Sequence, residues 1–161
     1  MDTEKNVKLL KEKIEDVRIC MFTTLSLNDE FSSRPMATAN VEDDGSIWFF
    51  TNEYSLKNPE IFKERVMLVY SNPSNNTYMY VNGKAQLVED IKKRSAYFSI
   101  MVKAWFPKGL EDPGLALIKV TPDVAEYWDS NSSKMVVAFN MLQAIVTGDK
   151  YDEGQHKKLK F

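Results

Sequence analysis

Short runs of β-branched and aromatic residues, each followed by a polar turn, recur along the first half of the chain. Residues 18–27 and 36–41 have strand character and are separated by the polar, turn-forming residues 28–35. The sequence EDDGS at residues 42–46 predicts a hairpin turn into a third strand at 47–51. Strands joined by such short connections pair antiparallel, so the chain is predicted to fold as a meander.

The same pattern continues in the second half. Further strands are predicted at residues 66–70, 78–88, 115–121 and 124–128, the last two on either side of Pro122. Gly83 lies inside the long segment 78–88, and we expect it to form a bulge where this strand bends around a barrel. One antiparallel barrel is the simplest architecture for these segments.

Four segments have helical patterns. They are residues 3–17, 58–65, 90–103 and 134–147, with Asp90 as a capping residue for the third and Gly148 ending the fourth. We expect the helix at 3–17 to cap the barrel. The loop at 105–114 is rich in Pro and Gly and carries two aromatic residues that we expect to be exposed, Trp105 and Phe106.

Composition limits the classes of function. The 161 residues are 43% hydrophobic and 27% charged, which is typical of one soluble domain, here predicted to span residues 1–161. A formal net charge of −2 argues against nucleic acid as a partner. The residues after Met1 do not resemble a signal peptide, and no window approaches the roughly 18 apolar residues of a membrane span, so we expect a cytoplasmic protein without a membrane partner.

The rare reactive residues exclude several chemistries. The single cysteine, Cys20, lies in the apolar run RICMF and is predicted to be a buried thiol in a reducing compartment. His156 is the only histidine, so the sequence offers no histidine-based triad and no metal cluster. Nucleotide-binding motifs of the GxGxxG and GxxxxGK[ST] types are also absent from the sequence.

Residues 47–60 (IWFFTNEYSLKNPE) join an apolar strand to a polar loop and a helix start. Thr51, Ser55 and Lys57 supply two hydroxyl groups and an ammonium group, and Asn58-Pro59 begins a helix whose free N–H groups favour anions. These groups predict an anion site. A solvated loop with an ordinary helix cap also explains the stretch, and on this stretch alone it is the favoured reading.

Arg34 adds a second cation. It precedes a predicted strand that lies antiparallel to the strand ending at Thr51, and neighbouring strands would place both residues on one wall. An arginine in this position binds phosphate in fork geometry while the loop closes around it. The hypothesis is that separate segments meet at one phosphate.

Six short motifs together resemble a known family, and the resemblance covers nearly the whole chain. They are similar to the FMN-binding split barrels related to pyridoxamine 5′-phosphate oxidase, and most closely to the general-stress-protein branch. The resemblance rests, in order, on SRPMA, DGSIWFFTN, SLKNPEI, VNGKAQLVED, AWFPKGLEDPGLALIKV and AEYWD. It implies a mainly β (α+β) fold: a six- to seven-stranded antiparallel split β-barrel with peripheral helices.

The resemblance also implies a cofactor site. Members of this family bind FMN at the interface of a homodimer, and their FMN residues correspond here to Arg34, Pro35, Met36, Phe50, Thr51, Ser55 and Lys57. Tyr78 stands at the position of a family glutamine. Trp128 matches a tryptophan that reaches the flavin from the second subunit, and Trp105 is expected at the mouth of the site.

Departures from the family pattern bear on activity. Leu56-Lys57 replaces an Arg-Lys pair at the phosphate loop, and SNSSK at residues 130–134 replaces the Arg-x-His-x-Arg run that holds the substrate in the oxidase. Oxidation of pyridoxamine 5′-phosphate is therefore not expected. Two hypotheses remain: a flavin-dependent oxidoreductase acting on an unknown small molecule, and a non-catalytic flavin-binding stress protein. Haem binding is disfavoured because His156 is the only histidine.

Overall fold

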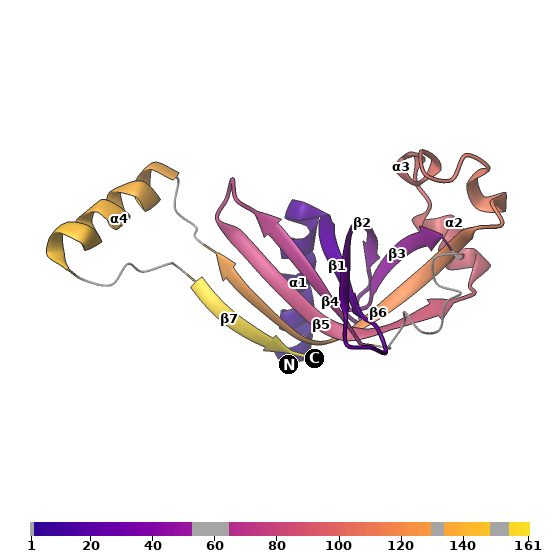
Figure 1. Ribbon diagram of the computed structural model, residues 1–161, viewed down its shortest axis with the longest axis horizontal. Coiled ribbons are helices and arrows are strands. Elements are labelled where there is room, and N and C mark those ends of the chain that lie inside the picture. The colour runs from indigo at the N-terminus through magenta and orange to yellow at the C-terminus, as the bar shows by residue number, and fades with distance from the viewer. Residues whose placement is uncertain (1, 53–64, 130–133, 149–154) are drawn as a thin grey trace.

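The computed structural model describes residues 2–52, 65–129, 134–148 and 155–161. The elements in chain order are α1 (Asp2–Val17), β1 (Ile19–Leu25), β2 (Phe31–Val41), β3 (Ile47–Asn52), β4 (Arg65–Asn72), β5 (Thr77–Val88), α2 (Ile91–Tyr97), α3 (Ile100–Lys103), the 3-10 helix η2 (Gly109–Glu111), β6 (Leu115–Asp129), α4 (Lys134–Thr147) and β7 (Gln155–Lys160). Figure 1 shows the barrel at the centre, with α4 beyond one end and α2 and α3 beyond the other.

The sheet is antiparallel and closes on itself. Its strand order is β3-β2-β1-β4-β5-β6-β7, and an additional β3–β6 pairing completes a six-stranded barrel. The first half of β6 pairs with β3, whereas its second half pairs with β7, so the two neighbours share one edge of this long strand. The predicted antiparallel barrel with helices around it is confirmed.

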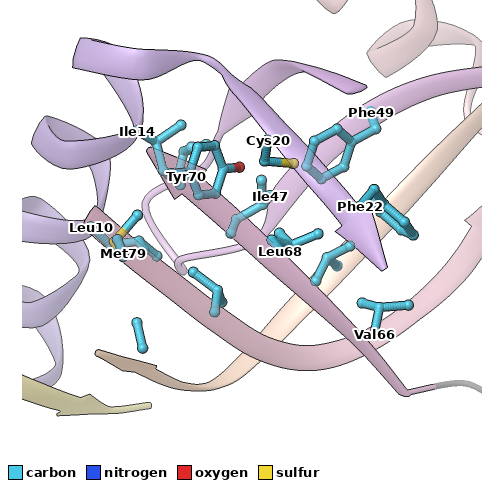
Figure 2. Close-up of a cluster of buried hydrophobic side chains, with 14 of the residues drawn as sticks. Leu10, Ile14, Cys20, Phe22, Ile47, Phe49, Val66, Leu68, Tyr70 and Met79 are labelled. Atoms are coloured by element: carbon cyan, nitrogen blue, oxygen red, sulfur yellow. The ribbon is translucent and has the colours of Figure 1, made fainter. Parts of the chain in front are cut away.

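The barrel interior holds an apolar core. Phe22 and Phe49 meet edge to face with ring centroids 5.3 Å apart, and Leu68 lies beside them (Figure 2). The predicted helix at 3–17 is confirmed as α1, which contributes Leu10 and Ile14 to this core and so covers the barrel as expected.

Several predicted boundaries were confirmed by their local geometry. The EDDGS turn joins β2 to β3 with Gly45 at φ 86°. The predicted irregularity at Gly83 is present, but the extra residue lies on the other strand: Asn82 pairs with Val124 and Gly83 with Pro122, so the bulged residue is Asp123 of β6. An added Cβ at Gly83 would lie 2.5 Å from the Thr121 carbonyl oxygen, so only glycine permits this close approach.

The β2 and β6 predictions needed correction. We expected a turn over residues 28–35, but β2 already begins at Phe31, because its first residues pair with β1 and the Thr23 and Ser33 hydroxyls lie 2.9 Å apart. Residues 115–121 and 124–128 form one strand rather than two, since the bulge accommodates Pro122 without breaking the ladder.

The region after β5 also differs from the prediction. A single helix over 90–103 was wrong: Asp90 caps α2 as predicted, but the chain is extended at Phe98 and restarts as α3. The break lets the Phe98 ring pack edge to face on Phe50, with centroids 6.0 Å apart. Phe106, expected to be exposed, is buried.

Strand β7 was missed entirely, because its charged sequence QHKKLK has only Leu159 as a core residue. The helix predicted at 134–147 is confirmed as α4. The helix predicted at 58–65 lies outside the described residues except for Arg65, which belongs to β4.

Candidate functional site

Arg34 lies on the inner face of the barrel wall. It pairs with Phe22 on β1, which pairs in turn with Leu68 on β4, and both of these side chains are in the core. Paired residues on antiparallel strands point to the same face, so the guanidinium extends from the end of an apolar row. Its side chain is half-buried, and this burial lowers the pKa of Arg34 below its ordinary value.

The charge of Arg34 has no compensating carboxylate in the described part of the chain. None of the ion pairs found there involves it, and loss of solvent alone accounts for the direction of its pKa shift. A cation withdrawn from water without a counter-ion is unfavourable unless a bound anion compensates it. This geometry suits an anionic ligand.

Thr51 lies on the neighbouring strand at the same end. It follows Phe49 by two residues on β3, and strand alternation places both on the inner face, where Thr51 is buried. Strands β2 and β3 run antiparallel with Thr38 opposite Phe49 as the last pair, so the part of β2 before Thr38, which carries Arg34, and the part of β3 after Phe49, which carries Thr51, extend from this pair in the same direction. Ser55 and Lys57 lie outside the described residues.

The other predicted residues of these two strands face different environments. Met36 is buried in the core on the inner face. Pro35 is exposed on the outer face opposite Met21. Phe50 also points outward, where it packs against Phe98.

Tyr78 and Trp128 are opposite each other on β5 and β6. Both lie on the outer face of the wall, because the intervening neighbours Met79 and Tyr127 belong to the core. The Trp128 ring lies 6.1 Å from the Tyr80 ring and is stacked on the His156 imidazole at 4.9 Å. Tyr78 keeps 42% of its surface exposed.

One chain does not bring Trp128 to Thr51. Thr51 is opposite Ala116 at the start of β6, whereas Trp128 is near the end of that strand. Trp128 lies twelve residues after Ala116 along the strand, roughly 40 Å of path at about 3.3 Å per residue. The two residues also face opposite sides of the wall.

Trp105 stands apart from both groups. It follows α3 and is 83% exposed.

Helix α2 covers the outside of β3. There the Tyr97 and Trp48 ring centroids lie 5.7 Å apart, and the Lys93 Nζ atom lies 4.6 Å from the centroid of the Trp48 ring. Glu42 fixes this arrangement by accepting hydrogen bonds from both Lys93 and Tyr97.

An uncharged outer face on β1, β2 and β4 was not anticipated. We call it the outer apolar face; it consists of Ile19, Met21, Pro35, Ala37, Met67 and Val69. Ile19 and Met21 are exposed. Val69 is opposite Tyr80, so this face adjoins the aromatic residues around Trp128. The signal that could have revealed it is that segments 18–27 and 66–70 contain apolar residues at successive positions. Because side chains alternate between the two faces of a strand, such a run must also place apolar residues on the outer face.

The thiol and possible metal ligands add no further site. Cys20 is a free, buried cysteine, as predicted, and burial raises its pKa to about 12. In the described ranges, no group of three or more His, Cys, Asp or Glu side chains is placed to hold a metal ion. None of the helices described has the length and apolar composition needed to cross a bilayer.

Comparison with known proteins gave a family match and several relatives. The sequence profile described as "Pyridoxamine 5'-phosphate oxidase like" matches residues 5–152. Protein bli-3 of Neurospora crassa is 27% identical over 157 residues, which cover 86% of this chain and 75% of the relative.

Solved structures share the fold. A candidate general stress protein 26 from Jannaschia sp. CCS1 superposes with a TM-score of 0.73 at 21% identity, covering 99% of each chain. The general stress FMN/FAD binding protein of Xanthomonas citri has a TM-score of 0.66 at 27% identity, covering 80% of this chain and 90% of the relative.

Proposed function

The chain belongs to the pyridoxamine 5′-phosphate oxidase-like family, and we propose that it binds a flavin, specifically FMN. The observation that carries this proposal is Arg34, a half-buried cation on the inner face of β2 without a carboxylate partner in the described part of the chain. A phosphate monoester provides the anionic oxygens that a guanidinium fork binds. The FMN/FAD-binding relative from Xanthomonas citri agrees with a flavin ligand.

In this proposal, the phosphate and ribityl chain are held by Arg34 and the buried Thr51 hydroxyl. Ser55 and Lys57 follow Thr51 closely in sequence and complete the phosphate site. Pro35, Met36 and Phe50 support the strands that carry these groups. Half-buried charge–phosphate contacts favour FMN over riboflavin, which lacks the phosphate.

We also propose that the site is completed by a second copy of the chain. Trp128 and Tyr78 face outward and lie far along β6 and β5 from Thr51, so residues of one copy would meet the flavin held by the other. The adjoining outer apolar face is suited to a homodimer interface, because it exposes Ile19 and Met21 without charges. Trp105 would then line the mouth of the site.

Bound flavin would supply hydride or single-electron transfer, and the chain would hold and shield it. We therefore infer a flavin-dependent oxidoreductase acting on a small molecule in a reducing compartment such as the cytoplasm, where the free Cys20 is stable. The alternative is a non-catalytic flavin-binding stress protein, which the replacement of the oxidase substrate run by SNSSK favours.

Two measurements test these statements. The absorption spectrum of the purified protein, followed by fluorescence titration with FMN and riboflavin, should show flavin binding with a preference for FMN. Absence of binding by both flavins would overturn the proposal. For catalysis, a nicotinamide donor should reduce the bound flavin and an added acceptor should reoxidise it faster than free FMN; equal rates would favour the non-catalytic alternative.

A further inference from the structure

The only histidine of the chain packs against the tryptophan proposed to contact flavin. His156 on β7 is directly opposite Trp128 on β6. Their rings are parallel, with an interplanar angle of 5° and centroids 4.9 Å apart. Stacked rings on adjacent strands stand upright from the sheet, so the imidazole restricts the rotamers open to the indole.

A carboxylate holds the imidazole in this position. The His156 Nε2 atom lies 2.5 Å from one oxygen of Glu126, and the Tyr80 hydroxyl donates a hydrogen bond of 2.5 Å to the other. Glu126 and Trp128 lie two residues apart on the same face of β6. Strands β5, β6 and β7 thus contribute to one linked group. Within it, the Tyr80 ring also lies beside the Trp128 ring, with centroids 6.1 Å apart.

Strand β7 does not depend on His156 for its attachment. Six residue pairs join β7 to β6, and the Leu159 side chain is buried in the core. At the far end of β7, the Asn6 side chain donates a hydrogen bond to the Lys160 carbonyl oxygen at 3.0 Å. The His156 side chain, which is 53% exposed, is therefore not needed to attach β7 and is available to restrict the Trp128 side chain.

We propose that His156 is a positioning residue that holds the Trp128 indole upright for contact with the flavin of a second copy. The inference rests on the proposed function. Restricting the indole before binding removes an ordering cost that would otherwise weaken the complex. Glu126 acts one step further away, by fixing the imidazole.

The test is FMN titration of His156→Ala, His156→Phe and a matched control, Lys157→Ala, which changes the adjacent exposed residue of β7. His156→Ala should bind FMN about three- to tenfold more weakly, the range expected for loss of an aromatic pair. His156→Phe keeps a stacking ring and should stay within about twofold of the wild type. Lys157→Ala should match the wild type.

A double-mutant cycle decides whether His156 acts through Trp128. In a Trp128→Ala background, His156→Ala should cause no further loss of FMN affinity. Equal losses in both backgrounds, or unchanged affinity of His156→Ala, would overturn the inference. If His156→Ala does not fold, Glu126→Gln carries the same test: its weaker binding must also disappear in the Trp128→Ala background.

The outcomes separate the inference from the proposed function. No flavin binding by the wild type would overturn both. Normal wild-type binding that is weakened by Arg34→Ala but unaffected by His156→Ala would overturn the inference alone.

Discussion

Replacing Arg34 by alanine should separate phosphate binding from folding. Charge-assisted hydrogen bonds contribute about 1.5–3 kcal/mol each, and each 1.4 kcal/mol corresponds to a tenfold change in affinity. Arg34→Ala should therefore weaken FMN binding by about ten- to a hundredfold. Riboflavin affinity should change little, because riboflavin has no phosphate for the guanidinium to bind.

The same substitution should not lower stability. The Arg34 guanidinium is half-buried and has no carboxylate partner among the described residues, so its removal breaks no ion pair there and relieves desolvation. We expect the free energy of unfolding of the flavin-free protein to fall by less than about 0.5 kcal/mol in urea denaturation. Arg34→Lys keeps the charge but loses the fork, and should bind FMN with intermediate affinity.

The control is Lys84→Ala, which removes one positive charge from an exposed position on β5. Fluorescence titration at one fixed ionic strength should give wild-type affinity for this variant. If wild type, Arg34→Ala and Lys84→Ala all bind FMN and riboflavin alike, the phosphate site at Arg34 is wrong. A parallel loss of FMN and riboflavin affinity in Arg34→Ala would instead indicate a structural role.

Three further predictions concern the fold and the dimer. Gly83→Ala forces a Cβ against the Thr121 carbonyl oxygen and should lower the free energy of unfolding by about 1–3 kcal/mol in urea denaturation, whereas an unchanged midpoint would contradict the close approach. Burial raises the pKa of Glu42, but hydrogen bonds led by that from Lys93 outweigh it and hold the pKa below its ordinary value. The stability that the ionised Glu42 carboxylate adds to the fold is therefore present above its unfolded-state pKa and is lost as pH falls through its folded-state pKa. Glu42→Gln should destabilise the protein at pH 7 but not near pH 2. Equal destabilisation at both pH values would refute this. Sedimentation should give about twice the 18.6 kDa of one chain, and Met21→Glu should shift it toward the single chain, whereas a wild-type monomer at micromolar concentration would argue against the dimer.

The sequence predicted those elements whose signals are local. Short apolar and aromatic runs bounded by polar turns located β1 and β3, and the amphipathic stripe located α1, because each buries a regular face in the core. Gly83 was identified as the place of an irregularity, since glycine inside a long strand usually marks a bulge or a close backbone approach, but the extra residue belongs to the facing strand β6. Asp90 was recognised as a cap from its position before the helical pattern.

Elements defined by tertiary contacts were not predictable in this way. The QHKKLK sequence of β7 has one core residue, and its pairing with β6 is visible only in the fold. The break between α2 and α3 occurs at Phe98, whose ring packs on Phe50, about fifty residues away in sequence, so this contact could not be read from the local pattern. For the candidate site, the sequence predicted that Arg34 and Thr51 belong to neighbouring segments of the barrel wall, which β2 and β3 are, but the outward direction of Trp128 and its contact with His156 required coordinates.

The direction of Trp128 depends on the bulge in β6. Before the bulge, Ile118 and Val120 point into the core, whereas after it Ala125 and Tyr127 do, so the inward positions change from even to odd residue numbers. Without the extra residue, Trp128 would face inward like Ile118. The bulge lies opposite Gly83 and also divides the part of β6 that pairs with β3 from the part that pairs with β7. One irregularity therefore lies where β6 changes its partner from β3 to β7, and it turns Trp128 to the outer wall. Since Thr51 remains on the inner wall, a single flavin that contacts both residues must draw them from two chains.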